Sequence, residues 1–185
     1  MPDTLPDLLR PSLDIVFVGI NPGLHSAAVG HYFASPTNRF WDALNLSGLV
    51  ARPLSPETDS MALEHGIGFT DVVKKPTRSA DELTAAEFVE GARLLLEKLV
   101  QYQPMIASFH GQTAYRNFMR YAEAKDLKGE LGYQGQPMKG FPIHVFVTPN
   151  PSAANARFGL PGLVDWYKEL KALRDKLKGS RVEHP

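Results

Sequence analysis

The chain has 185 residues, 43% of them apolar, with 20 basic and 20 acidic residues and no cysteine. This length and composition suit one domain with a full hydrophobic core. The lack of cysteine excludes disulfides, thiolate zinc sites and cysteine-ligated iron–sulfur clusters. A net charge of zero counts mildly against a nucleic-acid partner, although a local basic patch would be sufficient for one.

The N-terminal lead-in, residues 1–11, carries two aspartates and no long apolar stretch, so we expect no signal peptide. No apolar run reaches roughly 18 residues, the length that indicates a transmembrane helix. We therefore expect a cytoplasmic protein without a membrane partner, associated with the nucleoid if its source is prokaryotic. No linker or repeat divides the chain, and we expect a single domain over residues 1–185, with its core at about 13–177.

Short apolar runs that end at glycine or polar residues predict buried strands, and helical spacing of apolar residues predicts helices. Thr84 and Glu87 have the spacing of a capping box, while Asn38 and Gly48 are suited to begin and end another helix. Alternating strands and helices predict an α/β fold with a parallel sheet covered on both faces. The predicted elements are a strand at 13–18, a long loop at 26–37, helices at 38–47 and 56–64, a strand or extended segment at 67–73, a helix at 84–102, a strand at 104–109, a helix at 112–124, an irregular segment or small hairpin at 125–140, a strand at 143–147 and a helix at 160–177.

The first predicted strand ends in the most distinctive stretch of the sequence. The apolar run Ile15-Val16-Phe17-Val18 is closed by Gly19 and followed directly by Asn21-Pro22-Gly23. Pro22 has a fixed φ and restricts Asn21 to extended conformations. Ligands of open α/β sheets bind outside the carboxyl ends of the strands. We therefore expect Asn21 to be held at a binding crevice, together with the polar residues that end other predicted strands: Asp71, His110 and Asn150.

Two separated motifs carry a family resemblance. The first comprises Gly19-Ile20-Asn21-Pro22-Gly23-Leu24, Phe33 and Asn38-Arg39-Phe40-Trp41, and the second is Asn150-Pro151-Ser152. Between them lie Gly66-Ile67-Gly68-Phe69-Thr70-Asp71 and Lys75-Pro76-Thr77. Together these segments resemble the mismatch-specific uracil-DNA glycosylases, which belong with the thymine-DNA glycosylases in the uracil-DNA glycosylase superfamily. The resemblance implies a three-layer α/β/α sandwich around a short, mainly parallel sheet.

The resemblance also implies a DNA repair glycosylase that hydrolyses the N-glycosidic bond of uracil and of related damaged or mispaired pyrimidines. The target nucleotide is flipped into a pocket, and a positioned water attacks and leaves an abasic site. Such an enzyme needs no metal and no cofactor. The motifs place no lysine as a Schiff-base nucleophile, so we expect no lyase chemistry. The implied partner is double-stranded DNA with mispaired uracil, with single-stranded DNA as a second substrate, and the protein is expected to be a monomer.

The first motif carries the residues expected to bind the base and the water. Asn21 corresponds to the residue that positions the water, and its amide cannot accept a proton from that water. Phe33 corresponds to the aromatic residue that stacks on the flipped base. Backbone N–H groups near Ile20 and Leu24 are expected to hold base oxygens, and Ser26 to line the base edge. An Asn-Pro turn and a core aromatic residue are the structural alternatives for Asn21 and Phe33.

The second motif begins the loop that enters the duplex in this family. There the pattern continues Gly-Leu-Ser-Arg, and the leucine fills the space left by the flipped nucleotide. This chain instead has Ala153-Ala154-Asn155-Ala156-Arg157. Ala154 takes the place of the wedge and is small for that purpose, which leaves the strength of flipping and the preference for a mispaired partner open. We expect DNA contacts from Asn150, Pro151, Ser152, Ala154 and Arg157.

Asp71 departs from the family pattern, in which we expect no acid at this place. If it faces the crevice, it would be the general base that Asn21 cannot be, or would stabilise the sugar cation. The structural alternative is an aspartate that caps a turn or pairs with Lys74 or Lys75 at the surface. Together with Arg78, these lysines form a basic loop for which contact with phosphates is the other interpretation.

The six histidines are scattered and show no metal-binding spacing, so we expect no metal site. His25 and His110 are expected to be structural or solvated, as lone loop histidines usually are. Two functions of other classes stay open: a nucleic-acid-binding module on the same fold with little catalysis, and an α/β enzyme that acts on free nucleosides. Ala154 and the zero net charge slightly favour the binding module. Release of free uracil from a duplex would separate the glycosylase from both.

Overall fold

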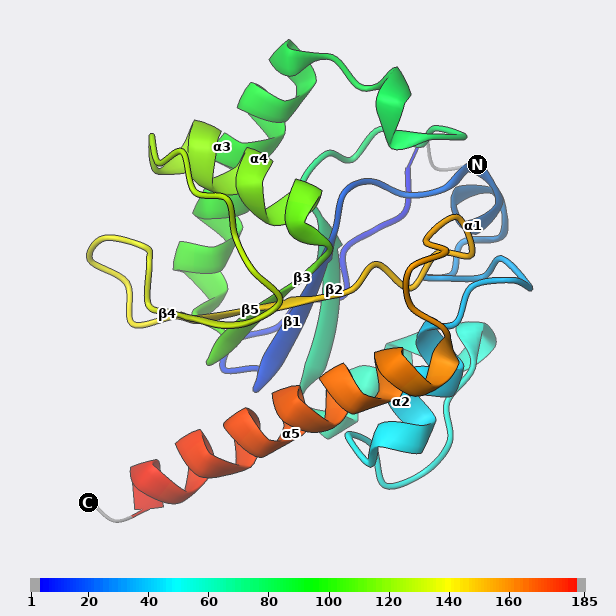
Figure 1. Cartoon of the computed structure of the whole chain (residues 1–185), viewed down its shortest axis with the longest axis vertical. Coiled ribbons are helices and arrows are strands. Elements are labelled where there is room, and N and C mark those ends of the chain that lie inside the picture. Colours follow the sequence, from blue (N-terminus) through cyan, green and yellow to red (C-terminus); the bar gives the residue numbers. More distant parts are fainter. Residues whose placement is uncertain (1–3, 183–185) are drawn as a thin grey trace.

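A five-stranded sheet in the order β2-β1-β3-β5-β4 forms the centre of the protein (Figure 1). The computed structural model describes residues 4–182, so residues 1–3 of the expected lead-in and residues 183–185 lie outside it. Strands β1, β2, β3 and β5 run parallel, and β4 pairs antiparallel with β5 at one edge. This mainly parallel sheet confirms the predicted fold class. The strands are β1 (Ile15–Gly19), β2 (Ile67–Asp71), β3 (Ile106–His110), β4 (Gly132–Gly135) and β5 (His144–Thr148).

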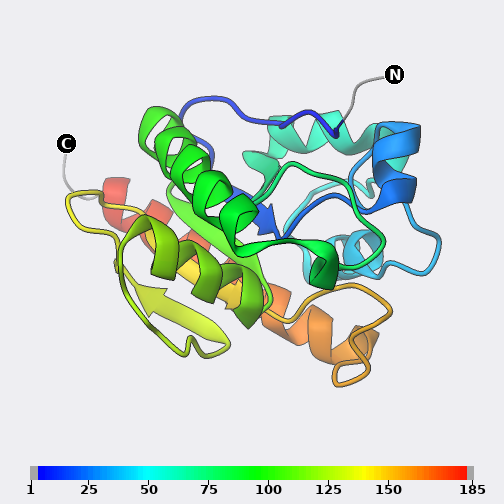
Figure 2. The same cartoon turned by 90° about the horizontal axis from the view of Figure 1, so that it is seen from above.

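Helices cover both faces of the sheet, which gives the three layers of an α/β/α sandwich (Figures 1 and 2). In β1, Ile15 and Phe17 belong to one apolar cluster, whereas Val16 and Val18 belong to the other, because alternate side chains of a strand face opposite sides. Burial on both faces explains why the strands are continuous apolar runs. The first cluster includes residues of α2 (Phe40–Ser47) and α5 (Leu160–Val182), and the second includes residues of α3 (Ala85–Tyr102) and α4 (Gln112–Ala122).

Two of the three predicted capping signals, Gly48 and the capping box at Thr84, are confirmed, whereas Asn38 lies one residue before the cap of α2. Gly48 ends α2 with a left-handed φ of 75°, which glycine adopts without steric cost. At the start of α3, the Thr84 side chain accepts the Glu87 N–H, and the Glu87 carboxylate accepts the Thr84 N–H, as expected for a capping box. At the start of α2, Asn38 Oδ1 accepts the Phe40 N–H at 2.9 Å, although the capping position itself is the residue after Asn38.

Two of the predicted elements were wrong. The predicted loop at 26–37 contains a short helix, α1 (Leu24–Val29), because its small residues include alanines, which favour helix. The segment predicted as a helix at 56–64 forms a 3-10 helix, η1 (Pro56–His65), which has a kink, and a second short one, η2 (Ala80–Glu82), was not predicted. Residues 125–140 are irregular apart from β4, which agrees with the first of the two alternatives, and β4 pairs antiparallel with the next strand, β5, at the edge of the main sheet.

The N-terminal segment lies along the outer edge of β2. Leu8 forms an antiparallel bridge with Phe69, with hydrogen bonds of 3.0 and 2.9 Å in the two directions. The Thr4 hydroxyl donates to the Lys74 carbonyl, and Asp7 Oδ1 accepts from the Thr70 hydroxyl at 2.8 Å. The segment therefore covers the edge of the sheet and brings the Asp7 carboxylate close to the end of β2.

Candidate active site

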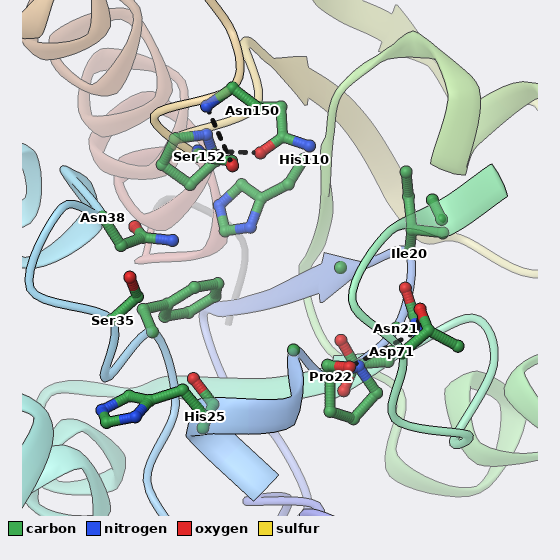
Figure 3. Close-up of a pocket in the computed structure, with 18 of the residues that line it drawn as sticks. Ile20, Asn21, Pro22, His25, Ser35, Asn38, Asp71, His110, Asn150 and Ser152 are labelled. Carbon is green, nitrogen blue, oxygen red and sulfur yellow. Dashed lines mark hydrogen bonds between the residues drawn. The ribbon is translucent and has the colours of Figure 1, made fainter. Parts of the chain in front are cut away.

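A pocket of about 680 Å³ opens at the strand ends, between the two sequence motifs (Figure 3). This volume lies in the range of small-molecule pockets, roughly 300–1,000 Å³. Asn21 and Asp71 lie on one side of the pocket, with Ser35 and Asn38 on the other. Arg157 is exposed and does not line it. The predicted site residues that line it are Ile20, Asn21, Leu24, Ser26, Phe33, Asp71, Asn150, Pro151, Ser152 and Ala154.

The Asn21 side chain is held in one orientation by its amide nitrogen. Nδ2 donates hydrogen bonds to the Lys75 carbonyl and to Thr77 Oγ1, both at 2.7 Å. A carbonyl oxygen can only accept, so the nitrogen rather than the oxygen of the amide must face Lys75. Thr77 Oγ1 in turn donates to the Ser79 carbonyl at 2.8 Å. Asn21 Oδ1 accepts no hydrogen bond from residues 4–182, so it is free to accept one from a water or ligand in the pocket.

Asp71 comes close to the first motif because β1 and β2 pair with Asp71 in register with Gly19. A Cβ at Gly19 would lie 2.5 Å from Asp71 Oδ1, so glycine is needed to make room for the carboxylate. The Asp71 side chain is 6% exposed, and its Oδ2 accepts from Lys74 Nζ at 3.3 Å. Within the described part of the chain, nothing donates a hydrogen bond to Oδ1. Asp71 thus lines the pocket and also pairs with Lys74, and in this pair the carboxylate is buried and the lysine half-buried.

The surroundings of Asp71 make it more basic than an ordinary aspartate. Burial raises its pKa to about 6, and attraction to Lys74 opposes part of that rise. The carboxyl group is therefore mostly ionised at neutral pH, yet is basic enough to take a proton from an attacking water. Burial and the nearby Asp71 charge both raise the pKa of Tyr32, so this phenol stays protonated beside the site.

Phe33 forms a wall of the pocket and rests on other aromatic rings. It stacks on Phe40 with ring centroids 4.0 Å apart and an interplanar angle of 26°, and it meets His110 edge-on at 5.2 Å. Phe33 has a φ of 54°, which is uncommon for a bulky residue. Ser26 Oγ accepts the N–H of Ala34 at 3.0 Å and fixes the backbone next to it. Packing and this hydrogen bond therefore hold the ring in an orientation that the isolated backbone would disfavour.

The two backbone groups expected to hold base oxygens differ in availability. The N–H of Leu24 donates to the Thr77 carbonyl at 3.3 Å, so it is not a free donor. The N–H of Ile20 has no hydrogen-bond partner in the part of the chain that the structure describes. Leu24 lines the pocket and is 46% exposed. A ligand would therefore contact its apolar side chain and not its N–H.

His110 is a buried pocket residue to which the sequence assigned no role. It is 2% exposed, its ring stacks on Phe17 at 5.1 Å, and its Nε2 lies 3.2 Å from the Tyr167 hydroxyl. Nδ1 has no partner among the described residues. Burial lowers the pKa of His110 to about 3, so the ring is neutral. The only sequence signal for this site was the position of the histidine at a predicted strand end.

The hydrogen-bonding capacity of Tyr167 indicates which tautomer His110 adopts. If Tyr167 donates to Nε2, the ring proton is on Nδ1, and that N–H is the only unsatisfied group. If Nε2 donates to Tyr167 instead, both the tyrosine proton and the Nδ1 lone pair are unsatisfied. Each buried unsatisfied group costs about 1–3 kcal/mol, so the first arrangement is favoured. His110 then has one N–H donor without a partner among the described residues, and this atom is buried just beneath the pocket surface.

Arg39 fixes the second motif to the first. Its guanidinium donates to four backbone carbonyl oxygens of the segment that follows Asn150: Pro151 at 3.4 Å, Ser152 at 2.6 Å, Asn155 at 2.9 Å, and Phe158. Asn150 Oδ1 accepts the Ser152 N–H at 2.9 Å and closes the turn where this segment begins. The sequence included Arg39 in the motif without giving it a role. Its contacts lie more than a hundred residues away along the chain, where no local pattern could reveal them.

The segment after the second motif presents small side chains to the pocket rim. Ala154 is exposed and lines the pocket. Arg157 is exposed as well, with its guanidinium 5.3 Å from the centre of the Phe158 ring. Phe158 is itself partly buried. No large apolar side chain therefore projects where the sequence places the wedge, which agrees with the small residue seen there in the sequence.

The three cations of the basic loop after β2 lie in different environments. Lys74 faces inward toward Asp71 and Asp7, and Lys75 pairs with Glu87 at 2.7 Å. Lys74 is therefore a half-buried partner of two acids, so the ammonium group is occupied by these carboxylates and is not presented to a phosphate. Arg78 is exposed and lines the pocket, which leaves it as the cation of this loop best placed to meet a phosphate.

The described residues contain neither a membrane-spanning helix nor a cluster of metal-ligand side chains. Between residues 4 and 182, no helix is both long and apolar enough to cross a membrane. The same residues contain no group of three or more His, Cys, Asp or Glu side chains that could hold a metal ion.

The chain is similar to known proteins in both sequence and fold. Residues 6–174 match the family model of the Uracil DNA glycosylase superfamily. The chain is also similar to a solution NMR structure of a candidate uracil DNA glycosylase from Methanosarcina acetivorans, with 19% sequence identity and a TM-score of 0.55. That match covers 91% of this chain and 97% of the other. At this identity the likeness concerns the fold alone, and it agrees with the mainly parallel sheet between two helical layers.

Proposed function

The chain belongs to the uracil DNA glycosylase superfamily, and on this basis we propose that it removes uracil from DNA, with mispaired uracil in a duplex as its main substrate. Hydrolysis of the N-glycosidic bond would release the free base and leave an abasic site. One observation carries the proposal: Asn21 and Asp71 line the same pocket, and each keeps one acceptor oxygen free while its other polar atom is anchored.

The shape and chemistry of the pocket suit a flipped pyrimidine. Phe33 offers a stacking surface that is supported from behind by Phe40, and stacking on an aromatic ring contributes about 1–3 kcal/mol per base. Asn38 Oδ1 accepts the Phe40 N–H, so its amide nitrogen is the end left to donate to a base carbonyl. Uracil has two such carbonyl oxygens, and the pocket has a donor on each of two sides, the Asn38 amide nitrogen and the Ile20 N–H.

The two free oxygens suit activation of a water molecule. Asn21 Oδ1 would orient the water by accepting one of its protons in a hydrogen bond. Asp71 would take the second proton as the water oxygen bonds to the anomeric carbon and the bond from that carbon to the base nitrogen breaks. The same carboxylate places negative charge near the sugar, which becomes positively charged in the transition state. Asp71 thereby supplies the proton acceptor that an amide cannot provide.

The leaving base carries away the electron pair of the broken bond as an anion. Two N–H groups that lack a partner among the described residues would stabilise it, the backbone N–H of Ile20 and the Nδ1–H of His110, which is buried in the unliganded protein. Preorganised donors of this kind act on charge that develops in the transition state, and their loss typically costs on the order of 100-fold in rate or more. A neutral histidine is suited to this role, since it donates a hydrogen bond to the developing anion without the cost of burying a charged ring.

The DNA itself would lie across the pocket mouth. Leu24 and Ala154 offer apolar surface there, and the exposed Arg78 and Arg157 offer charge for phosphates. Because the Ala154 side chain is small, it would fill little of the space left in the duplex and would stabilise the flipped state only weakly. We therefore propose only modest discrimination by the opposing base, with single-stranded DNA as a competing substrate.

A panel of labelled substrates tests this function. It contains duplexes with uracil opposite each base, a duplex with thymine opposite guanine, and a uracil-containing single strand, all under single-turnover conditions. The matched control is the double variant Asn21→Ala with Asp71→Asn, which should release no base above background. We expect release of free uracil, fastest from the guanine mispair.

Two other outcomes would replace the proposal. Tight binding to abasic DNA without any release of base would favour a nucleic-acid-binding module. Cleavage of a free nucleoside without activity on DNA would favour a nucleoside enzyme.

A further inference from the structure

Behind Asp71 lies a chain of alternating charges that reaches the N-terminal segment. Lys74 Nζ is 3.3 Å from Asp71 Oδ2 and 2.9 Å from Asp7 Oδ1. Asp7 Oδ2 is in turn 2.5 Å from Lys98 Nζ, on α3. The side chains of Asp7, Lys74 and Lys98 are between 19% and 27% exposed, so solvent and salt only partly screen these ion pairs.

The geometry makes Lys74 a shared partner rather than a dedicated one. Its third contact is with the Tyr32 hydroxyl at 3.2 Å, so the three donors of the ammonium have three acceptors. The Thr70 hydroxyl also donates to Asp7 Oδ1, at 2.8 Å, which is the oxygen that Lys74 contacts. Neither Asp7 nor Lys98 lines the pocket. Groups outside the pocket therefore contact the lysine that neutralises the carboxylate inside it.

We infer that Asp7 is a positioning residue for the reaction, because it shares Lys74 with Asp71 and so sets how readily Asp71 accepts a proton. The inference rests on the proposed function, in which Asp71 is the proton acceptor. It gives the N-terminal segment a part in catalysis although no atom of Asp7 reaches the pocket.

The direction of each effect follows from the charges. Asp7 repels a negative charge on Asp71 and competes for Lys74, so it favours the protonated form of Asp71. Lys98 partly neutralises Asp7 and therefore acts in the opposite direction. The pKa of Asp71 reflects this balance: burial raises it most, Lys74 lowers it, Asp7 raises it and Lys98 lowers it. The other titratable groups nearby, Tyr32 and His110, are both uncharged.

Two substitutions outside the pocket test the inference with opposite expected signs. Asp7→Asn removes the charge but keeps an oxygen that can accept from Thr70, and Lys98→Met removes the charge but keeps the apolar stem. The Asp71 titration midpoint should move to lower pH in Asp7→Asn and to higher pH in Lys98→Met. Each shift should be about half a unit to one unit, in the lower range of what one neighbouring charge produces. NMR of the carbon-13-labelled Asp71 carboxyl group in the free protein measures both, and Asp71→Asn identifies the resonance.

Single-turnover rates of uracil release should follow the same order. The pH at which the rate is half its plateau should shift down in Asp7→Asn and up in Lys98→Met. The plateau rate should be lower in Asp7→Asn, since a weaker base accepts the proton less readily. The matched control is Asp175→Asn, which breaks an ion pair with Lys171 and Arg174 on α5 and should shift neither quantity.

A purely structural role for Asp7 would lower stability without producing shifts of opposite sign. An unchanged Asp71 titration in Asp7→Asn, or shifts of the same sign in both variants, would overturn the inference even if the enzyme is active. Expected titration shifts in a protein that releases no uracil would instead overturn the proposed function, because the titration is measured without substrate.

Discussion

Asn21 donates its amide proton to Thr77 Oγ1 at 2.7 Å, and this contact helps to fix which end of the amide faces the pocket. Because the Thr77 hydroxyl uses its own proton on the Ser79 carbonyl, it has none to give to the Asn21 oxygen. The two residues are 56 positions apart in the chain, and they meet because β1 and β2 pair in parallel and end at the same edge. The orientation of the proposed water site therefore depends on a threonine outside the Asn21 motif.

Asn21→Ala should reduce the single-turnover rate of uracil release by ~100-fold or more, which is within the range for one positioned catalytic group. DNA affinity should change little, because the variant removes one small pocket side chain. Rapid-quench assays with saturating enzyme measure the rate, and fluorescence anisotropy measures the affinity. A rate within a few-fold of wild type would remove Asn21 from the mechanism.

Thr77→Val serves as a graded control for Asn21. It keeps the shape of the side chain but removes the acceptor for Nδ2, which leaves the Lys75 carbonyl as the main anchor of the amide. We expect a loss of roughly 10-fold in rate, because the amide is less well oriented, which corresponds to an increase of about 1.4 kcal/mol in the activation free energy. A Thr77→Val rate as low as that of Asn21→Ala would indicate damage to the whole loop.

Asp71→Asn should lower the rate by about 10- to 100-fold, since it removes the proton acceptor and the negative charge but keeps the size of the side chain. In the wild type the rate should fall as pH drops through about 6, the raised pKa of Asp71, because the protonated acid cannot act as a base. The variant should lack this dependence. A wild-type rate at every pH in Asp71→Asn would leave Asn21 as the remaining catalytic side chain.

Asp71→Asn should also make the protein more stable at neutral pH. Burial raises the pKa of Asp71 from 3.8 to about 6. At a pH between these two pKa values, the folded state therefore binds more protons than the unfolded state. Stability contributed by this group is therefore lost as pH rises through that window. We expect a gain of about 1–2 kcal/mol for the variant near pH 7.5. Urea unfolding at several pH values measures it, and a gain that fails to shrink below pH 6 would contradict the assigned cause.

Ala154→Leu should tighten binding to a duplex with a guanine–uracil mispair. A larger apolar side chain fills more of the space left by the flipped nucleotide and offsets part of the unstacking cost, which is a few kcal/mol. The effect on single-stranded DNA should be smaller, because there is no stack to replace. Anisotropy titrations of both substrates measure this, with Ala156→Leu as the matched control on the same segment. Equal effects on the two substrates would show that Ala154 does not probe the duplex.

Tyr167→Phe should weaken the use of His110 as a donor to the base. Without the hydroxyl, Nε2 loses its partner and the ring proton is no longer held on Nδ1. One hydrogen bond is worth about 1 kcal/mol, so the rate constant at subsaturating enzyme should fall roughly fivefold. Nitrogen-15 NMR of the histidine ring reports the tautomer directly. A ring proton found on Nε2 in the wild type would overturn the assignment.

The sequence by itself determined the layers of the fold and the edge at which the site lies. Apolar runs such as 15–18 indicate a strand that is buried on both faces of the sheet. This pattern is local in the sequence, so it can be recognised without tertiary information. Glycine and capping signals at Gly48 and Thr84 are also local. Because parallel strands end at one edge, the polar residues that follow them were expected to meet there, and Asn21, Asp71, His110 and Asn150 do line one pocket.

Only the tertiary structure decided how those residues are oriented and what holds them. Asp71 could be expected at the pocket or paired with a lysine, and the fold does both, because β2 ends at the pocket and its outer edge is covered by the N-terminal segment. The partners that fix each group lie far away in the chain, as with Asp7 and Thr70, 63 positions apart. A sequence pattern reports periodicity and local turns, whereas hydrogen bonds and ion pairs depend on which distant segments the packed core brings within about 3 Å.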